Sequence, residues 1–189
     1  HIVEQLGCFY STSTVPFVDI GAADGYFAVG VAKLDWAEKV FAFEISSVAR
    51  SILEGNAISN SCANKIDIQS EATLDNIADI IHTYPGVFVL VDIEGAEYDL
   101  FNHDLLKLLK HSTVIIELHP RKIKDGWLKQ TKLLEEAAQF FKTEILVRES
   151  YSPNVFKELS EFSDDDRLLA LSEGRKASAQ WLLLRPISH

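Results

Sequence analysis

The chain has 189 residues, a net charge of −10 and 47% hydrophobic residues, which suits one globular domain with a sizeable core. The negative charge argues against a nucleic-acid-binding surface and against docking on an anionic membrane, because both need clustered Lys and Arg. No apolar run approaches the roughly 20 residues of a membrane-spanning helix, so we expect a small-molecule or neutral partner.

Seven short apolar runs predict β-strands. The runs at 86–94 and 112–119 are almost continuously apolar, which is typical of central strands covered on both faces. The predicted strands span residues 15–21, 39–44, 65–70, 86–94, 112–119, 143–150 and 179–186.

Amphipathic stretches separate these strands. Apolar residues recur at helical spacing over 98–110 and again over 128–141, which predicts a helix in each. Repeated alternation of strand and helix favours an α/β fold with a doubly wound, mostly parallel sheet. We expect one domain over residues 1–189, with a cofactor half at about 15–97 and a substrate-side segment at about 120–178.

The polar stretch 151–178 contains the acidic run "SDDDRLLALSEG". A helix start explains this run better than a metal site: Ser163 caps the helix with Asp166 as reciprocal partner, and Gly174 ends it. Trp127 and Tyr151 are candidate aromatic walls for a sugar, although ordinary packing is the simpler interpretation of both.

The two cysteines, Cys8 and Cys62, are far apart in the sequence and have no metal-ligand spacing. They are interpreted as buried or incidental thiols, and a reducing, cytoplasmic compartment is expected.

The stretch "VPFVDIGAADGYFAVGVA" places an acid just before a glycine turn. Gly21 and Gly25, with Ala22 between them, let the backbone turn sharply and approach a ligand closely. Asp19 ends the preceding strand, where ligands bind in open parallel sheets. Tyr26 is a candidate cover for the ligand, and Phe27 fits the core better.

Two further acids close the next two predicted strands. Glu44, in "FAFE", is placed to accept hydrogen bonds from ribose hydroxyls, and Glu71 is placed to accept one from an adenine amine. A pyrophosphate would be repelled by Asp19 and Asp24, and the glycine spacing is not that of nicotinamide enzymes. The pattern therefore favours S-adenosylmethionine, which has no phosphate, as the cofactor.

The second motif, "VLVDIEGAEYDLF", places several acids after a very apolar strand. Glu97 and Asp99 are explained by the first turn of a helix, which favours acids. Asp92 and Glu94 share strand parity, so their side chains are expected on the same side. Two adjacent carboxylates repel each other unless a cation, a proton or a donor lies between them. Gly95 permits the turn into the next helix.

The hexapeptide "DIEGAE", preceded by "DIGAADGYF" and "FAFE" and followed by "IIELHP", resembles the FkbM family of S-adenosylmethionine-dependent methyltransferases. The resemblance covers residues 15–186. It implies a Rossmann-like class I methyltransferase fold with seven strands, the last one antiparallel, and methyl transfer to a hydroxyl of a sugar, glycan or polyketide-type molecule. The family usually has "GANIG" where this chain has Ala23 and Asp24, so one contact to the cofactor is expected to differ.

Transfer of a methyl group to a hydroxyl calls for a base or a metal to remove the proton. The catalytic candidates are Asp92, Glu94 and His119, and Asp92 is also a candidate for cofactor binding. His119 is either a general base or a polar residue at a strand end. Glu117 shares its strand parity and is placed to orient it or to join a metal site. Carboxylates and imidazole hold Mg²⁺ or Mn²⁺, but the sequence leaves a metal open.

Two alternatives remain at this point. The first is a nicotinamide-dependent oxidoreductase, or another nucleotide binder, on a similar fold. The second is a non-catalytic module that binds S-adenosylmethionine without turnover.

Overall fold

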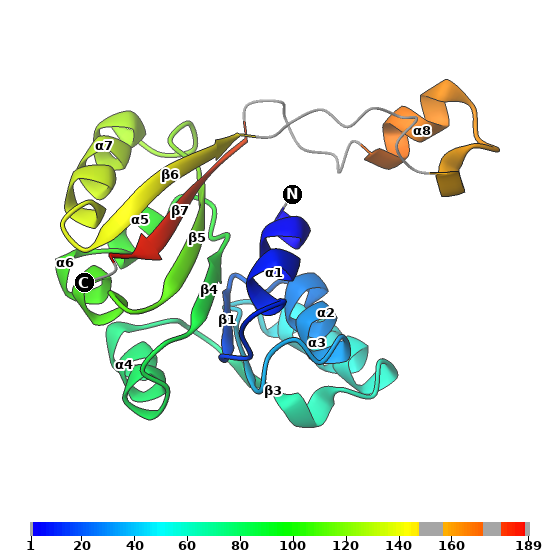
Figure 1. The fold of residues 1–189 in the computed structure, drawn as a ribbon, viewed down its shortest axis with the longest axis horizontal. Helices are drawn as coiled ribbons and strands as arrows, with labels where there is room; N and C mark the ends of the chain where they lie inside the picture. The colour runs from blue at the N-terminus through cyan, green and yellow to red at the C-terminus, as the bar shows by residue number, and fades with distance from the viewer. Residues whose placement is uncertain (1, 148–156, 172–178, 188–189) are drawn as a thin grey trace.

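The computed structural model describes residues 2–147, 157–171 and 179–187, which form a single seven-stranded sheet flanked by helices (Figure 1). The strands follow the order β3-β2-β1-β4-β5-β7-β6. Their bounds are β1 (Phe17–Ile20), β2 (Val40–Phe43), β3 (Ile66–Gln69), β4 (Phe88–Val91), β5 (Thr113–Leu118), β6 (Phe141–Val147) and β7 (Gln180–Pro186).

Strands β1 to β5 pair in parallel, and β7 is antiparallel to both β5 and β6. The last strand is therefore inserted antiparallel between β5 and β6. This is the class I methyltransferase topology that the sequence predicted. The strand order reverses between β1 and β4, and in such sheets ligands bind at the carboxyl ends of the strands at that point.

The helices cover both faces of the sheet, except the helix at 164–171, which lies away from it (Figure 1). The α-helices are α1 (Ile2–Tyr10), α2 (Tyr26–Lys33), α3 (Ser47–Ser59), α4 (Leu74–Thr83), α5 (Glu97–Leu100), α6 (His103–Leu108), α7 (Gly126–Ala137) and α8 (Asp164–Leu171); two 3₁₀ turns, η1 (Ala63–Lys65) and η2 (Lys157–Leu159), complete the elements. No described helix has the length and apolar character that crossing a membrane requires.

Alternate residues of each strand enter two separate apolar cores. Val18 and Ile20 of β1 pack into the core that α4, α6 and α7 cover. Phe17, on the other face of the same strand, packs into the core that α1, α2 and α3 cover. Asp19 has the same parity as Phe17, so its side chain is directed to the α1–α3 side of the sheet.

Three features differ from the predicted elements. The helix predicted over 98–110 is interrupted: α5 ends at Leu100, and the Asn102 side chain accepts a hydrogen bond from the backbone N–H of Leu105 (3.0 Å) to cap α6. An asparagine cap starts a new helix because its oxygen replaces a missing intrahelical acceptor. The helix predicted over 128–141 is α7, and Phe141 belongs to β6 instead.

Helix α1 was not predicted, although its buried residues Ile2, Leu6 and Tyr10 have helical spacing. The helix predicted at the acidic run is confirmed as α8, because Ser163 Oγ accepts from the Asp166 backbone N–H (3.2 Å) and donates to the Asp166 carboxylate (2.7 Å). Gly174 and Tyr151 lie outside the described residues.

Candidate functional site

The turn after β1, residues 21–25, is here called the first turn. Gly21 and Gly25 adopt φ of 87° and 90°, values that residues with a side chain rarely adopt. A Cβ on Gly21 would lie 2.0 Å from the backbone oxygen of Asp92, and one on Gly25 would lie 2.8 Å from Leu53 Cγ. The glycines are therefore required here by close contact as well as by conformation.

Glu44, at the end of β2, holds the first turn in place. Its Oε2 accepts a hydrogen bond from the Ala23 backbone N–H (3.0 Å), and its Oε1 accepts one from the Ser46 N–H (2.7 Å). Each carboxylate oxygen has a second lone pair, so Glu44 can still accept hydrogen bonds from a ligand hydroxyl.

Asp19 is an almost fully buried carboxylate, with 3% of its surface exposed. Burial raises the pKa of Asp19 to about 7; an amide hydrogen bond from Ala28 opposes this rise, and the charges of Asp92 and Glu44 add to it. Among the described residues, its Oδ2 atom has no hydrogen-bond partner. Such an atom requires a cation or a donor, and the ligand that enters this site can supply one.

Two pockets open at the carboxyl edge of the sheet. The first has a volume of about 450 Å³ and includes Asp19, Ala22, Asp24, Tyr26 and Glu117 in its wall. The second has a volume of about 500 Å³ and includes Glu44, Glu71 and the apolar Ile45 and Ala72. Gly21 and Asp92 belong to both walls, so the two pockets meet there. Each volume is typical of a small-molecule site.

The predicted cofactor residues therefore come together, apart from Gly25, which shapes the first turn but lines neither pocket. Tyr26 is exposed at the rim of the first pocket, whereas Phe27 is half-buried against the core that α1, α2 and α3 cover. Trp127 is exposed on α7 and lines neither of the two pockets, so it is not an aromatic wall of this site.

The turn after β4, residues 92–95, is here called the second turn. The expectation that Asp92 and Glu94 share strand parity is wrong: β4 ends at Val91, and Glu94 has a φ of 60°. The apolar run continues into the turn as Ile93, which made the strand look longer than it is. The turn nevertheless brings both carboxylates to the same imidazole.

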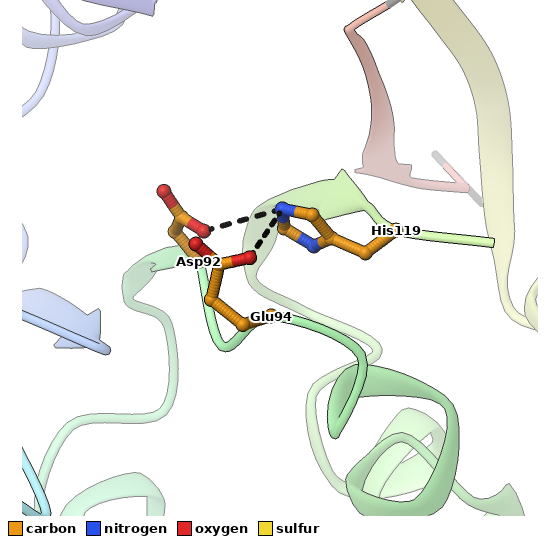
Figure 2. Close-up of side chains that lie close together, drawn as sticks. All are labelled: Asp92, Glu94 and His119. Carbon is orange, nitrogen blue, oxygen red and sulfur yellow. Dashed lines mark ion pairs between the residues drawn. The ribbon is translucent and has the colours of Figure 1, made fainter. Parts of the chain in front are cut away.

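That imidazole belongs to His119, directly after β5. Its Nε2 lies 3.6 Å from Asp92 Oδ1 and 3.4 Å from Glu94 Oε2, as the dashed lines in Figure 2 show. Glu117 Oε1, from within β5, lies 3.7 Å from the same nitrogen. Lys122 contacts the Glu94 carboxylate from the solvent side.

Glu97 is the residue that the sequence interpretation missed. Its position in the first turn of a helix is enough to explain an acid, yet Glu97 is fully buried, with 0% exposed surface. Its Oε2 accepts from the Gly95 N–H (2.7 Å), and its Oε1 accepts from the His119 N–H (2.9 Å). The same Oε1 lies 3.3 Å from His119 Nδ1. Glu97 thus holds both the second turn and the histidine.

The charge state of His119 follows from these neighbours. Burial by itself lowers the pKa of His119, but the hydrogen bond to Glu97 and the charges of Glu97, Glu117 and Asp92 together raise it above its ordinary value. A carboxylate can only accept a hydrogen bond, so Nδ1 carries a proton and Nε2 faces Asp92 and Glu94.

No protein-family model and no curated protein matches the sequence. Solved structures match over nearly the whole chain. A precorrin-6y C5,15-methyltransferase from Geobacter metallireducens aligns over 97% of this chain and 88% of its own, with a TM-score of 0.61 and 14% identity. This chain has the class I methyltransferase fold.

Two further neighbours were solved with the methyl donor or its product bound. An O-methyltransferase from Bacillus cereus in complex with SAH aligns over 95% of this chain and 78% of its own (TM-score 0.62, 11% identity). TomG from Streptomyces achromogenes, an O-methyltransferase of tomaymycin synthesis in complex with SAM, aligns over 97% of this chain and 79% of its own (TM-score 0.61, 12% identity). At these identities the likeness establishes the fold.

Proposed function

We propose that this protein is an S-adenosylmethionine-dependent methyltransferase that acts on a hydroxyl group. One observation carries the proposal: an unpartnered buried carboxylate, Asp19, and the sugar-binding candidate Glu44 lie in two pockets that meet at Gly21 and Asp92. The fold and the ligands of the Bacillus and Streptomyces neighbours agree with it.

The residues fit this donor part by part. Glu44 and Glu71 in the second pocket suit the hydroxyls and the amine of an adenosine, and Ile45 and Ala72 offer apolar walls to a base. In the first pocket, Asp19 and Asp24 suit an ammonium group and the positive charge of a sulfonium. The same carboxylates disfavour the pyrophosphate of a dinucleotide, which argues against an oxidoreductase.

When bound, S-adenosylmethionine supplies a methyl group activated by the sulfonium. The chain's own contribution is to position the acceptor and to take up its proton. Asp92 lies where the pockets meet, and His119 lies 3.6 Å from it. Asp92 is placed to accept a hydroxyl proton at that junction, and His119, which lines neither pocket, is placed behind Asp92 as the next proton acceptor. Glu97 keeps the imidazole oriented, so the proton acceptor does not have to be ordered during the reaction.

The acceptor class follows from the FkbM resemblance, which rests on the motifs "DIGAADGYF", "FAFE", "DIEGAE" and "IIELHP". We infer a hydroxyl on a sugar, a glycan or a polyketide-type molecule in a single-domain, cytoplasmic enzyme. The acidic pocket walls exclude acceptors that carry phosphate or carboxylate at the reacting end.

The first test compares ligands. S-adenosylhomocysteine should raise the thermal unfolding midpoint of the protein, and NAD should not, because only a ligand of the folded state stabilises it. A shift with NAD alone would favour the oxidoreductase alternative. Binding of S-adenosylhomocysteine without turnover of any acceptor in a panel of hydroxyl-bearing glycans and natural products would favour the non-catalytic module.

The second test separates binding from chemistry. Asp92→Ala and Glu44→Ala should each lower kcat/KM for methyl transfer by about 100-fold, which corresponds to about 2.7 kcal/mol of transition-state stabilisation. Glu44→Ala should act mainly through a raised KM for the donor. Wild-type turnover in Asp92→Ala would remove that residue from the mechanism.

A further inference from the structure

Three side chains from two separate segments converge beside the junction of the pockets: Asp92 lines both pockets, Glu94 lines the second, and His119 lies behind them. Asp92 and Glu94 come from the second turn, and His119 comes from the end of β5 (Figure 2). One ligand atom of each, among Asp92, Glu94 and His119, lies within 4.8 Å of the others. We call these three residues the rim cluster.

The two ring nitrogens of His119 face different partners. Glu97 is fully buried and contacts Nδ1 from behind, so Nε2 faces the two carboxylates. Two neighbouring anions are unfavourable unless a positive charge lies beside them, and either a proton on Nε2 or a bound cation supplies it. Histidines that bind metals commonly donate their other ring N–H to a carboxylate in this way.

The distances are close to those of a coordination sphere. Two neighbouring ligands of a six-coordinate ion with bonds of about 2.1 Å lie about 3.0 Å apart. The distances from His119 Nε2 to the carboxylate oxygens, 3.6 Å and 3.4 Å, exceed this by a few tenths of an ångström. Small side-chain movements would therefore close the site.

The space beside the cluster also calls for a cation. Four carboxylates line the first pocket, and no Lys or Arg is among its described lining residues, which include Asp19, Asp24, Asp92 and Glu117. Asp19, whose Oδ2 atom has no hydrogen-bond partner in the described part of the chain, is almost fully buried and lines this pocket. Lys122 pairs with Glu94, and both side chains are largely exposed, so that ion pair is weak and can open.

We propose that Asp92, Glu94 and His119 bind a divalent cation, with Mn²⁺ or Mg²⁺ as the metals that two carboxylates and one imidazole favour. Three protein ligands leave coordination positions open toward the pockets. If the proposed methyl transfer is correct, the acceptor hydroxyl occupies one of them, and the metal lowers its pKa so that its proton passes to solvent water. The alkoxide oxygen then forms a bond to the methyl carbon as the S–CH3 bond breaks, and the donor leaves as S-adenosylhomocysteine. His119 is then a ligand, and Glu97 is a positioning residue.

Mn²⁺ titrated into the purified chain tests the site without any activity assay. We expect binding in calorimetry with a 1:1 stoichiometry, and pulsed EPR should show coupling of Mn²⁺ to one imidazole nitrogen. His119→Ala and Asp92→Asn should each weaken binding by at least tenfold. Glu97→Gln should weaken it by about 10- to 100-fold while S-adenosylhomocysteine still binds.

A matched control is available in α8. Asp165→Asn removes one charge from an exposed acidic run that contains no histidine, and it should leave Mn²⁺ binding unchanged. If a variant of the cluster fails to fold, the nitrogen coupling in the wild-type protein decides the question alone. Mn²⁺ binding without nitrogen coupling, or equal loss in Asp165→Asn, would overturn the proposal.

The two proposals fail in different ways. No Mn²⁺ binding together with normal binding of S-adenosylhomocysteine would mean that the cluster holds a proton, and His119 would then return to the role of general base. Mn²⁺ binding without S-adenosylhomocysteine binding would keep the metal site and refute the proposed function.

Discussion

The turn after β1 and the turn after β4 both follow a buried four-residue strand, both contain acids, and both have a glycine at positive φ. Each is held by one glutamate: Glu44 accepts from the Ala23 N–H, and Glu97 accepts from the Gly95 N–H. The difference lies in what the neighbouring strand adds. Strand β2 is followed by Glu44, a half-exposed acid in a pocket wall, whereas β5 is followed by His119.

This comparison shows that the local pattern of strand, acid, glycine and helix does not by itself define the chemistry. The first turn borders both pockets because Gly21 brings bare backbone to them. The second becomes part of a polar cluster because His119, which lies 22 positions after Glu97, completes it. The following predictions test how far the two turns differ.

The largest effect is expected at the glycines. Gly21→Ala places a Cβ 2.0 Å from the backbone oxygen of Asp92 at a φ of 87°, and backbone cannot move aside easily. We expect a loss of about 4 kcal/mol or more in the free energy of unfolding, measured in urea. Gly95→Ala is also strained by a φ of 115°, but its Cβ meets a side-chain methyl of Ile123 at 2.6 Å, which can move, so it should cost less than Gly21→Ala.

Gly30→Ala is the control for these variants. Gly30 lies within α2, and none of the described atoms lies within 4 Å of the added Cβ. It should stabilise the protein by up to about 1 kcal/mol, because alanine favours the helix. Equal losses in Gly21→Ala and Gly95→Ala would show that the two turns tolerate side chains alike.

The next effect concerns Asp19 and pH. Its pKa of about 7 in the folded protein exceeds the ordinary value near 3.9, so the folded state holds the proton more tightly. The resulting stability is complete below about pH 4 and is lost as pH rises through 7. Asp19→Asn should therefore stabilise the ligand-free protein at pH 8 by roughly 2 to 4 kcal/mol, and by little at pH 4.

The same group should couple ligand binding to pH. The ammonium group of S-adenosylhomocysteine favours the charged carboxylate, so this ligand should bind more tightly as pH rises from 6 to 8, by up to about tenfold over that range. The charges of Glu44 and Asp92 contribute to the raised pKa of Asp19. In Asp19→Asn, calorimetry should show that the affinity for S-adenosylhomocysteine no longer rises with pH. If the rise persists, another group causes it.

The smallest effects distinguish the two supporting glutamates. Glu97→Gln places an amide N–H₂ among buried N–H donors and should cost about 1 to 3 kcal/mol in thermal unfolding, with little change in S-adenosylhomocysteine affinity. Glu44 is half-exposed, so Glu44→Gln should lower the free energy of unfolding by less than about 1 kcal/mol. The same variant should bind S-adenosylhomocysteine about tenfold more weakly. A larger loss of stability in Glu44→Gln, or a larger loss of affinity in Glu97→Gln, would mean that the two glutamates have the opposite roles.

Much of the fold could be read from the sequence, because buried parallel strands and amphipathic helices leave strong periodic signals. The acids at the carboxyl edge were also found, since Asp19, Glu44 and Asp92 each follow or end such a run. Boundaries were less certain. Ile93 prolongs the apolar run beyond β4, and Asn102 interrupts a helix that the apolar pattern alone continues.

Glu97 shows why the rest could not be predicted. An acid at a helix start already has a local explanation, and its burial depends on β5, which brings the His119 backbone and ring to it. The only available signal was the pairing of "DIEGAE" with a histidine at the end of the next strand. Only the parallel pairing of β4 with β5 brings these two segments together, and local spacing in the sequence does not show it.

The missing side chain of Gly21 has one more consequence. Because nothing separates it from the Asp92 carbonyl, the backbones of two distant segments rest directly against each other and act as a fixed spacer. Methyl transfer tolerates an error of only about 1 Å between the reacting atoms. In the proposed reaction, Gly21 therefore fixes the separation of the two turns, because it places no side chain between them.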